Sequence, residues 1–145
     1  MYYHRVVLYF DGASRHNPHG PAGCGWVLYE MNEHGTDDDH IAEDSAYLGY
    51  DVSNNQAEYE ALDRGLRYVR EYINCGTLYV RGDSEIIIKQ MTGEYQVRSD
   101  KIIPYYNDTK NEYYGLDCNV IFRHIPRHKN WYADQLANEA IDNGY

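Results

Sequence analysis

The sequence predicts an α/β fold built on a five-stranded mixed sheet, with three antiparallel strands followed by two parallel strands and helices on both faces. Five apolar, β-prone runs and four stretches of helical periodicity carry this prediction. Short connections between the first three runs imply antiparallel pairing, whereas helical crossovers before the last two imply parallel neighbours. No repeat, linker or break in composition divides the chain, so we expect a single domain over residues 1–145.

The individual elements can be assigned in chain order. The expected strands cover residues 6–10, 23–29, 46–50, 78–81 and 119–122. The expected helices cover residues 54–73, 84–91, 100–114 and 131–141. The first run is continuously apolar, which is typical of a central strand covered on both faces. We expect a hairpin at residues 32–39 and the end of the first helix at residues 74–76.

Composition limits the classes of protein to consider. Apolar residues make up 43% and charged residues 25% of the chain, which indicates a globular protein. No apolar stretch approaches the length of a membrane span, and the N-terminus lacks a charged segment followed by an apolar one. We therefore expect a cytoplasmic, monomeric protein without a membrane partner. Cys24, Cys75 and Cys118 lack CxxC spacing, and we interpret them as buried apolar residues rather than a zinc site or disulfides.

The net charge of −10 argues against nucleic-acid binding through overall electrostatics. Two considerations weaken this objection. A metal site gathers several carboxylates, and bound divalent cations reverse the local field there. Much of the remaining acid forms separate segments at residues 37–39 and 43–44, which we expect at a solvated hairpin tip.

Two aspartates follow predicted strands. Asp11 ends the first strand and Asp83 the fourth, and each is followed by a small residue. An ordinary turn residue would explain Asp11, and a helix cap would explain Asp83. In open α/β sheets, however, reacting groups collect at the carboxyl ends of the strands. If the first and fourth strands are parallel neighbours, these two carboxylates meet.

Two further acids lie on apolar faces of predicted helices. Glu58 is in helical register with the apolar stripe of its helix, which consists of Leu62, Leu66, Val69 and Ile73. Asp134 is similarly in line with Ala137, Asn138 and Ile141. A carboxylate on such a stripe is costly unless a cation meets it, and Arg123 or Arg127 could be that cation. Convergence of all four acids favours divalent metal ions instead.

With these residues identified, the sequence resembles the type 1 ribonuclease H family. The matching segments run along nearly the whole chain and carry the four acids in the family's order. They are Tyr9-Phe10-Asp11-Gly12-Ala13-Ser14 with Asn17-Pro18, Gly23-Cys24-Gly25-Trp26, Asn54-Asn55-Gln56-Ala57-Glu58-Tyr59, Gly82-Asp83-Ser84 and Ala133-Asp134-Gln135-Leu136-Ala137. The region after Ser84 has few basic residues, so the chain is similar to short members that lack a basic protrusion.

The resemblance implies a ribonuclease H-like fold and a metal-dependent endoribonuclease that cuts the RNA strand of RNA–DNA hybrids. It implies a two-metal mechanism with Mg²⁺ or Mn²⁺, in which one ion activates water and the other stabilises the leaving 3′ oxygen. The products would carry 5′-phosphate and 3′-hydroxyl ends. By the same resemblance, Asp11 bridges the two ions, Glu58 and Asp83 join it, and Asp134 binds the ion on the water side. Four acids without His or Cys suit Mg²⁺.

The resemblance also suggests substrate-binding residues. Ser14, Asn17, Asn54 and Asn55 match positions that contact the hybrid, where amide groups can bond base edges and the 2′-hydroxyl. A turn residue and a helix N-cap are the alternative explanations for these asparagines.

The family's mobile catalytic histidine has no secure counterpart. An ungapped alignment selects His124, but a shortened loop would place Arg127 in that role, with His128 as a second candidate. We prefer Arg127. A basic loop that only contacts phosphate would explain these residues equally simply.

Other functions remain open from the sequence alone. They are a hybrid-binding module without catalysis, cleavage of double-stranded RNA, a domain that serves a reverse transcriptase, and an acidic structural protein with buried ion pairs. A binding module would lack one of the acids, and none is missing. An acidic structural protein would show no dependence on metal.

Overall fold

The structure, a computed structural model, describes residues 1–144 apart from the side chains of residues 37 and 38. Five strands form one mixed sheet in the order β3-β2-β1-β4-β5, as the sequence predicted. The strands are β1 (Tyr2–Ser14), β2 (Ala22–Met31), β3 (Asp37–Gly49), β4 (Asn74–Gly82) and β5 (Asn119–His124). The helices are α1 (Asn54–Tyr72), α2 (Glu85–Thr92), α3 (Ile103–Tyr114) and α4 (Trp131–Asn143), preceded by a 3-10 turn, η1 (Arg127–Lys129).

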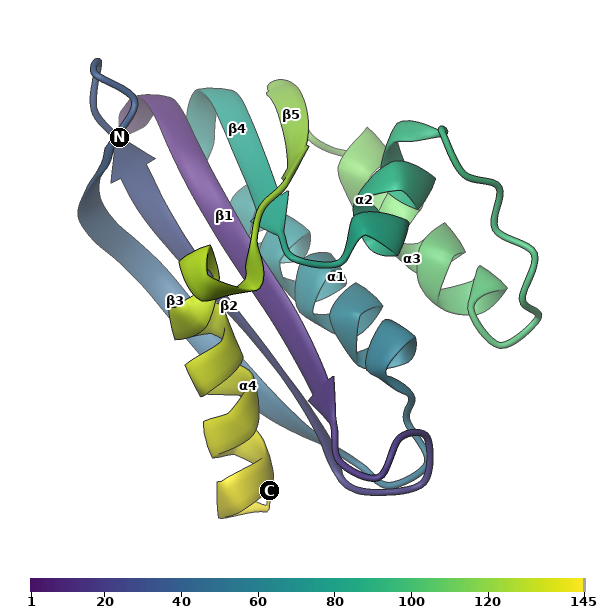
Figure 1. The fold of residues 1–145 in the computed structure, drawn as a ribbon. Coiled ribbons are helices and arrows are strands. Elements are labelled where there is room, and N and C mark those ends of the chain that lie inside the picture. The colour runs from purple at the N-terminus through teal and green to yellow at the C-terminus, as the bar shows by residue number, and fades with distance from the viewer. Residues whose placement is uncertain (145) are drawn as a thin grey trace.

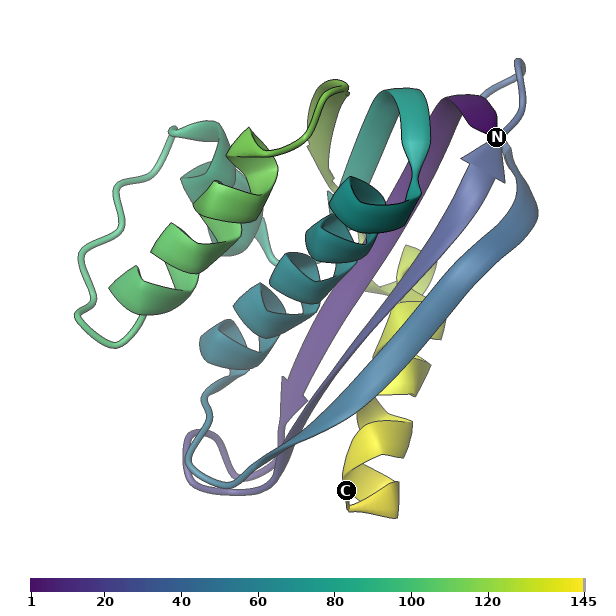
Figure 2. The same ribbon diagram turned by 180° about the vertical axis from the view of Figure 1, so that it is seen from behind.

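The helices lie on both faces of the sheet. Helix α4 packs on one face, against β2, and α1 covers the other face with α2 and α3 beside it (Figures 1 and 2). The first three strands pair antiparallel, whereas β1, β4 and β5 are parallel neighbours. The apolar stripe predicted for α1 is buried at Leu62, Leu66 and Val69 against the β1 side chains of Leu8 and Phe10. This packing fixes the N-terminal end of α1 over the end of β1.

The third strand is longer than predicted. Only residues 32–36 form the turn, which Asn32 closes by accepting the N–H groups of His34 and Thr36. The acids at residues 39, 43 and 44 therefore lie within β3 rather than at a hairpin tip, while the side chains of Asp37 and Asp38 lie outside the described residues. The prediction failed because an edge strand can carry charged residues that a central strand cannot. Residues 74–76 were also assigned wrongly, since Ile73 caps α1 and Asn74 already begins β4.

The two edges of the sheet differ in charge. Strand β3 forms one edge and contains no lysine or arginine, and its acids include Asp39, Glu43 and Asp44. Strand β5 forms the other edge, contains no acid and ends with Arg123 and His124, both exposed. Acidic and basic residues are thus separated across the width of the sheet.

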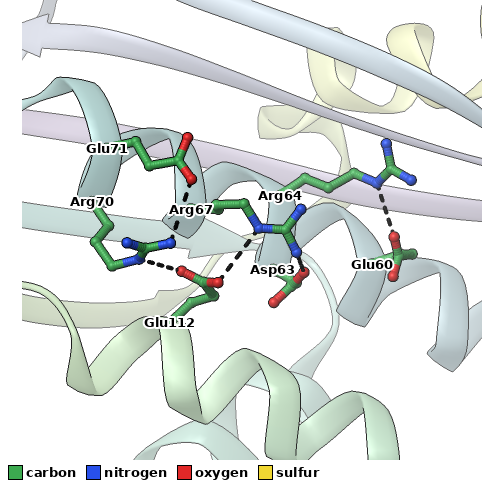
Figure 3. A network of polar contacts seen from close by, with 7 residues as sticks. All are labelled: Glu60, Asp63, Arg64, Arg67, Arg70, Glu71 and Glu112. Carbon is green, nitrogen blue, oxygen red and sulfur yellow. Dashed lines mark hydrogen bonds and ion pairs between the residues drawn. The ribbon is translucent and has the colours of Figure 1, made fainter.

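Ion pairs join α1 to α3 (Figure 3). Arg67 donates to Asp63 at 2.5 Å and to Glu112 at 3.4 Å. Arg70 donates to the other oxygen of Glu112 at 2.6 Å. Glu112 therefore ties α3 to α1 through two arginines. We call Asp63, Arg67, Arg70 and Glu112 the α1–α3 network.

Two further sequence predictions concern membranes and cysteines. Among the described residues, no helix is long and apolar enough to cross a membrane. Cys24 and Cys75 are buried and unbridged, as predicted, whereas Cys118 is only partly buried.

Candidate active site

Two of the predicted acids come from the neighbouring strands β1 and β4. These strands pair in parallel up to Tyr9 opposite Arg81, so Asp11 lies two residues beyond the last pair and Asp83 directly follows β4. Asp11 does not end its strand as predicted, because β1 continues to Ser14 by pairing with β2. The cap of α2 is Ser84, whose hydroxyl accepts a backbone N–H of the first turn at 3.4 Å. Asp83 is therefore not needed as a cap and remains available to the cleft.

Glu58 reaches the same place from the N-terminal part of α1. Its side chain is on the buried face of the helix, and the residue is only 8% exposed, as its position on the apolar stripe predicted. Gly12 allows the close approach of β1 and α1. A Cβ at Gly12 would lie 2.3 Å from both the Ala57 carbonyl carbon and the Glu58 nitrogen. A larger residue at this position would separate Glu58 from Asp11.

The structure brings the four predicted acids to one cleft. Asp11, Glu58 and Asp83 can each place one carboxylate oxygen within 4.8 Å of the others. Asp134, in the first turn of α4, lines the same cavity of about 430 Å³. Its side chain is 34% exposed, so it stands at the rim of the buried cluster.

Burial and mutual repulsion raise the pKa values of the clustered carboxyls. Burial is the main cause that raises the pKa of Asp11 to about 7; a hydrogen bond from Glu58 opposes the rise, and the charges of Asp83 and Asp134 add to it. Burial and the charge of Asp11 raise the pKa of Glu58 well above its usual value. Burial also raises the pKa of Asp83, against the opposing effects of Arg127 and Asn130. The buried carboxyls of the cleft therefore lack a neutralising positive charge.

The predicted arginine partners do not remove this lack. Arg127 lies 3.9 Å from Asp134, and its side chain is 83% exposed, so the contact is weak. Arg123 lies opposite Arg81 on the β5 edge and is not among the residues that line the cavity. Within the described part of the chain, Asp11 and Glu58 have no ion pair with an arginine or lysine. Buried ion pairs within the protein therefore do not explain the cluster.

The donor set fits a hard divalent cation. One buried oxygen of Glu58, Oε2, has no hydrogen-bond partner among the described residues. An ionised oxygen in such a place is costly unless a cation is near. Carboxylate oxygens from several elements are the ligands that Mg²⁺ and Mn²⁺ prefer, and neither His nor Cys lines the cavity.

Only some of the predicted substrate residues line the cavity. Ser14 and Asn54 line the cavity, whereas Asn17 and Asn55 are exposed outside it. The side-chain oxygen of Asn54 accepts the Ser14 N–H at 2.8 Å, and that of Asn17 accepts the Asn54 N–H at 3.0 Å. Ser53 is the N-cap of α1, so the alternative explanation of an asparagine cap is wrong.

The three candidates for the mobile basic residue differ in whether they line the cavity. Arg127 lines the cavity that holds the four acids, and His124 and His128 do not. His124 is the last residue of β5 and lies opposite Gly82 in the sheet register. His128 is exposed on η1.

Two residues of the site were missed from the sequence. Asn130 is 1% exposed, donates to the Phe10 carbonyl at 2.9 Å, and hydrogen-bonds Asp83. Asn138 donates to the Asp134 carboxylate at 3.3 Å and also accepts from Arg15. Both asparagines fix the positions of acids, and their only sequence signal is that each lies four residues from Asp134.

Fold and site together define a ribonuclease H-like α/β protein. Acids from β1, from α1, from the segment between β4 and α2, and from α4 line one cleft. Comparisons agree with this class. The family described as reverse transcriptase-like matches residues 9–140. Ribonuclease HI of Halobacterium salinarum is 39% identical over 138 residues, which are 95% of this chain and 65% of that protein.

Two solved structures extend the likeness to the fold. RNase H1 from the same archaeon is 36% identical with a TM-score of 0.83, over 97% of this chain and 99% of that chain. LC11-RNase H1, solved in complex with an RNA/DNA hybrid, is 38% identical with a TM-score of 0.83, over 95% and 97% of the two chains. The chain belongs to the type 1 ribonuclease H family. It spans 65% of the length of the Halobacterium protein and 36% of three mycobacterial relatives.

Proposed function

We propose that this chain is a metal-dependent endoribonuclease that hydrolyses the RNA strand of RNA–DNA hybrids. The observation that carries the proposal is the cleft in which Asp11, Glu58 and Asp83 face one another without a cation from the protein. The relatives named ribonuclease HI and the LC11 complex with hybrid support the substrate.

In this proposal the four acids hold two Mg²⁺ or Mn²⁺ ions. Bound ions of this kind activate water and stabilise the leaving oxygen, and the products carry 5′-phosphate and 3′-hydroxyl ends. Asp11, whose carboxyl meets a hydrogen bond with Glu58 and the charges of Asp83 and Asp134, would hold both ions. Glu58 and Asp83 would join it, and Asp134 would hold the ion that activates water. Asn130 and Asn138 keep Asp83 and Asp134 oriented for this work.

Residues around the cleft bind the substrate. Asn54 uses its oxygen within the protein, which leaves its amide nitrogen to donate to the hybrid. Ser14, Asn17 and Asn55 complete a polar surface suited to the minor groove and its 2′-hydroxyls. Arg127 holds phosphate near the cut and the departing product, since its guanidinium is permanently charged and lines the cleft. His128 is the second candidate for this role.

A cleavage assay tests the proposal. Hybrid, double-stranded RNA and single-stranded RNA are each incubated with Mg²⁺, Mn²⁺ or EDTA, and the products are resolved on a gel with end analysis. We expect internal cuts in the RNA of the hybrid with either metal and none in EDTA. Cutting of double-stranded RNA would widen the substrate class. An uncut hybrid, or cutting that persists in EDTA, would refute the proposal.

The oligomeric state of the protein and its location in the cell are separate parts of the proposal. We propose a monomer that acts in the cytoplasm. Light scattering after size exclusion tests the first point, and fractionation of the source cells tests the second.

A further inference from the structure

A second cavity lies on the α4 face of the sheet, beside the acid cleft. Its volume is about 250 Å³. Aromatic side chains dominate its wall, and they come from β1, β2 and the start of α4. They are Tyr9, Tyr29, Trp131 and Tyr132. The proposed hydrolysis uses none of them.

The aromatic rings are held in place by their neighbours. Tyr9 and Tyr29 meet edge to face with their centroids 6.0 Å apart. Trp131 and Tyr132 meet in the same manner at 5.4 Å, and the Tyr132 hydroxyl donates to Glu43 at 2.8 Å. Trp131 is nevertheless 63% exposed. Fixed rings with an open face are suited to stacking against a flat ligand.

Basic groups border this cavity, although the whole chain is acidic. Residues 118–133 contain no Asp or Glu and include Arg123, Arg127 and Lys129. Lys129 lines the cavity itself. Arg81 donates to the Tyr9 hydroxyl at 2.9 Å, with its guanidinium carbon 5.8 Å from the centre of that ring. The charges of Glu43 and Glu139 act on Tyr132, and Glu43 already accepts from His40 and Tyr132. A ligand with a flat ring and a phosphate matches these groups.

The aromatic cavity and the acid cleft are separate, but the turn that precedes α4 contributes residues to both. Arg127, at the start of η1, lines the cleft, whereas Lys129, at its end, lines the cavity. Asn130, next in the chain, lines the cavity and donates to the carbonyl of Phe10, the neighbour of Asp11. An RNA strand that leaves the cleft along this turn therefore passes from Arg127 to Lys129 and the aromatic rings.

We propose that the aromatic cavity binds an unpaired nucleotide of the RNA strand, with its base against Trp131 and its phosphate at Lys129. The inference rests on the proposed function, because the cleft is what brings the RNA strand to this turn. A paired base cannot enter, since its face is stacked within the duplex. The protein therefore prefers hybrids that end in, or border on, single-stranded RNA.

Binding in EDTA tests this inference without cleavage. Fluorescence anisotropy compares a blunt hybrid with hybrids that carry a short RNA overhang at the 5′ or the 3′ end. We expect one RNA overhang to tighten binding about tenfold, the size of one base stack. Equal affinity for the blunt hybrid and both RNA overhangs would overturn the inference. An equal gain from a DNA overhang would overturn it as well.

Variants and intrinsic fluorescence identify the cavity. Trp131→Ala should abolish the preference for the overhang, and Trp131→Phe should restore most of it because the ring is kept. Tyr114→Ala is the matched control, since Tyr114 is 70% exposed on α3 and lies outside the cavity. Trp26, the other tryptophan, is only 5% exposed. A decrease in tryptophan fluorescence when the overhang binds therefore reports on Trp131. A preference that survives in Trp131→Ala would refute the site.

The two proposals fail in different ways. If the wild type cuts no hybrid with either metal, the proposed activity is wrong, and the anisotropy result still decides whether the cavity binds RNA. If the hybrid is cut but no overhang binds more tightly, the cavity proposal alone is wrong.

Discussion

Between α1 and α3, acidic side chains are paired with arginines, whereas in the cleft they face one another. Asp63 and Glu112 each meet a guanidinium within 3.4 Å (Figure 3). Burial would raise the pKa of Glu112, but the hydrogen bonds and charges of Arg70 and Arg67 outweigh burial and lower it. In the cleft, the balance is reversed for Asp11 and Glu58, whose pKa values rise.

This difference separates two uses of acidic residues. The α1–α3 network supplies its own cations, so its acids serve to dock one helix on another. The cleft leaves Asp11 and Glu58 without an arginine or lysine partner among the described residues, which raises the free energy of the folded protein. In the proposed function, divalent ions from solution would remove this penalty. The same residue types thus stabilise the contact between α1 and α3 and destabilise the metal-free cleft.

The largest expected effect is on catalysis. Asp11→Asn or Asp83→Asn should lower the rate of hybrid cleavage by several orders of magnitude, because each change removes a ligand from the metal site. Glu112→Gln should cleave at nearly the wild-type rate, because its carboxylate serves the α1–α3 network. Steady-state rates on one hybrid measure both. Retained activity in Asp11→Asn would remove the basis of the proposed mechanism.

A smaller effect on catalysis is expected from the loop before α4. Arg127→Ala should slow cleavage by about ten- to a hundredfold, the range of a lost charged hydrogen-bond donor at a reacting phosphate. His128→Ala should have an intermediate effect, and His124→Ala should have almost none, because His124 ends β5 outside the cleft. Single-turnover and steady-state rates separate chemistry from product release. Slow release in His124→Ala with a silent Arg127→Ala would restore the ungapped alignment.

Stability without metal should change in opposite directions in the two regions. In EDTA, Asp11→Asn should melt several degrees above the wild type, because neutralising one carboxylate relieves a penalty of a few kcal/mol. Glu112→Gln should melt a few degrees below it, since Arg67 and Arg70 lose their partner. Added Mg²⁺ should stabilise the wild type by mass action and Asp11→Asn less. Calorimetry with and without metal measures each shift, and a lower melting temperature for Asp11→Asn in EDTA would favour internal cationic partners.

The pH dependence of stability should follow the same contrast. A carboxyl whose pKa is raised in the folded state contributes stability below its unfolded pKa near 4, and this is lost as the pH rises through the folded value. For Asp11 that value is about 7, so the wild type in EDTA should lose stability between about pH 4 and pH 7. Glu112, with a lowered pKa, contributes stability that is lost only as the pH falls below the usual range.

Asp63 complicates this profile and requires a control. Burial raises its pKa to about 6, against the charge of Arg67, so it adds a loss of the same sign. The slope that disappears in Asp11→Asn belongs to Asp11, and the slope that remains belongs to Glu58, Asp83 and Asp63, whose pKa values are also raised. An unchanged pH profile in Asp11→Asn would contradict the pKa assigned to Asp11.

The order of strands and helices could be predicted from the sequence because apolar periodicity and connection length decide it. Asp83 followed from its place after a strand and Glu58 from its place on an apolar stripe. Asp11 was expected at a strand end, but β1 continues to Ser14 because β2 pairs with it further than the apolar run indicates. The extent of β3 could not be predicted, since an edge strand needs no apolar alternation on both faces. Asn130 was also missed, because its partner Phe10 lies 120 positions away and only the folded chain brings them together. Which side chain near η1 enters the cleft depends in the same way on tertiary contacts.

The separation of charge between the two edges gives the sheet an electric dipole across its width. In the field of a polyanion this dipole experiences a torque that turns the β5 edge forward and the β3 edge away. The overall repulsion expected from a net charge of −10 is then offset by orientation as the distance shortens. Orientations in which the loop before α4 faces the polyanion are consequently favoured during encounters. Reversing the sign of the β3 acids would leave every contact in the cleft intact and still alter how often a collision is productive.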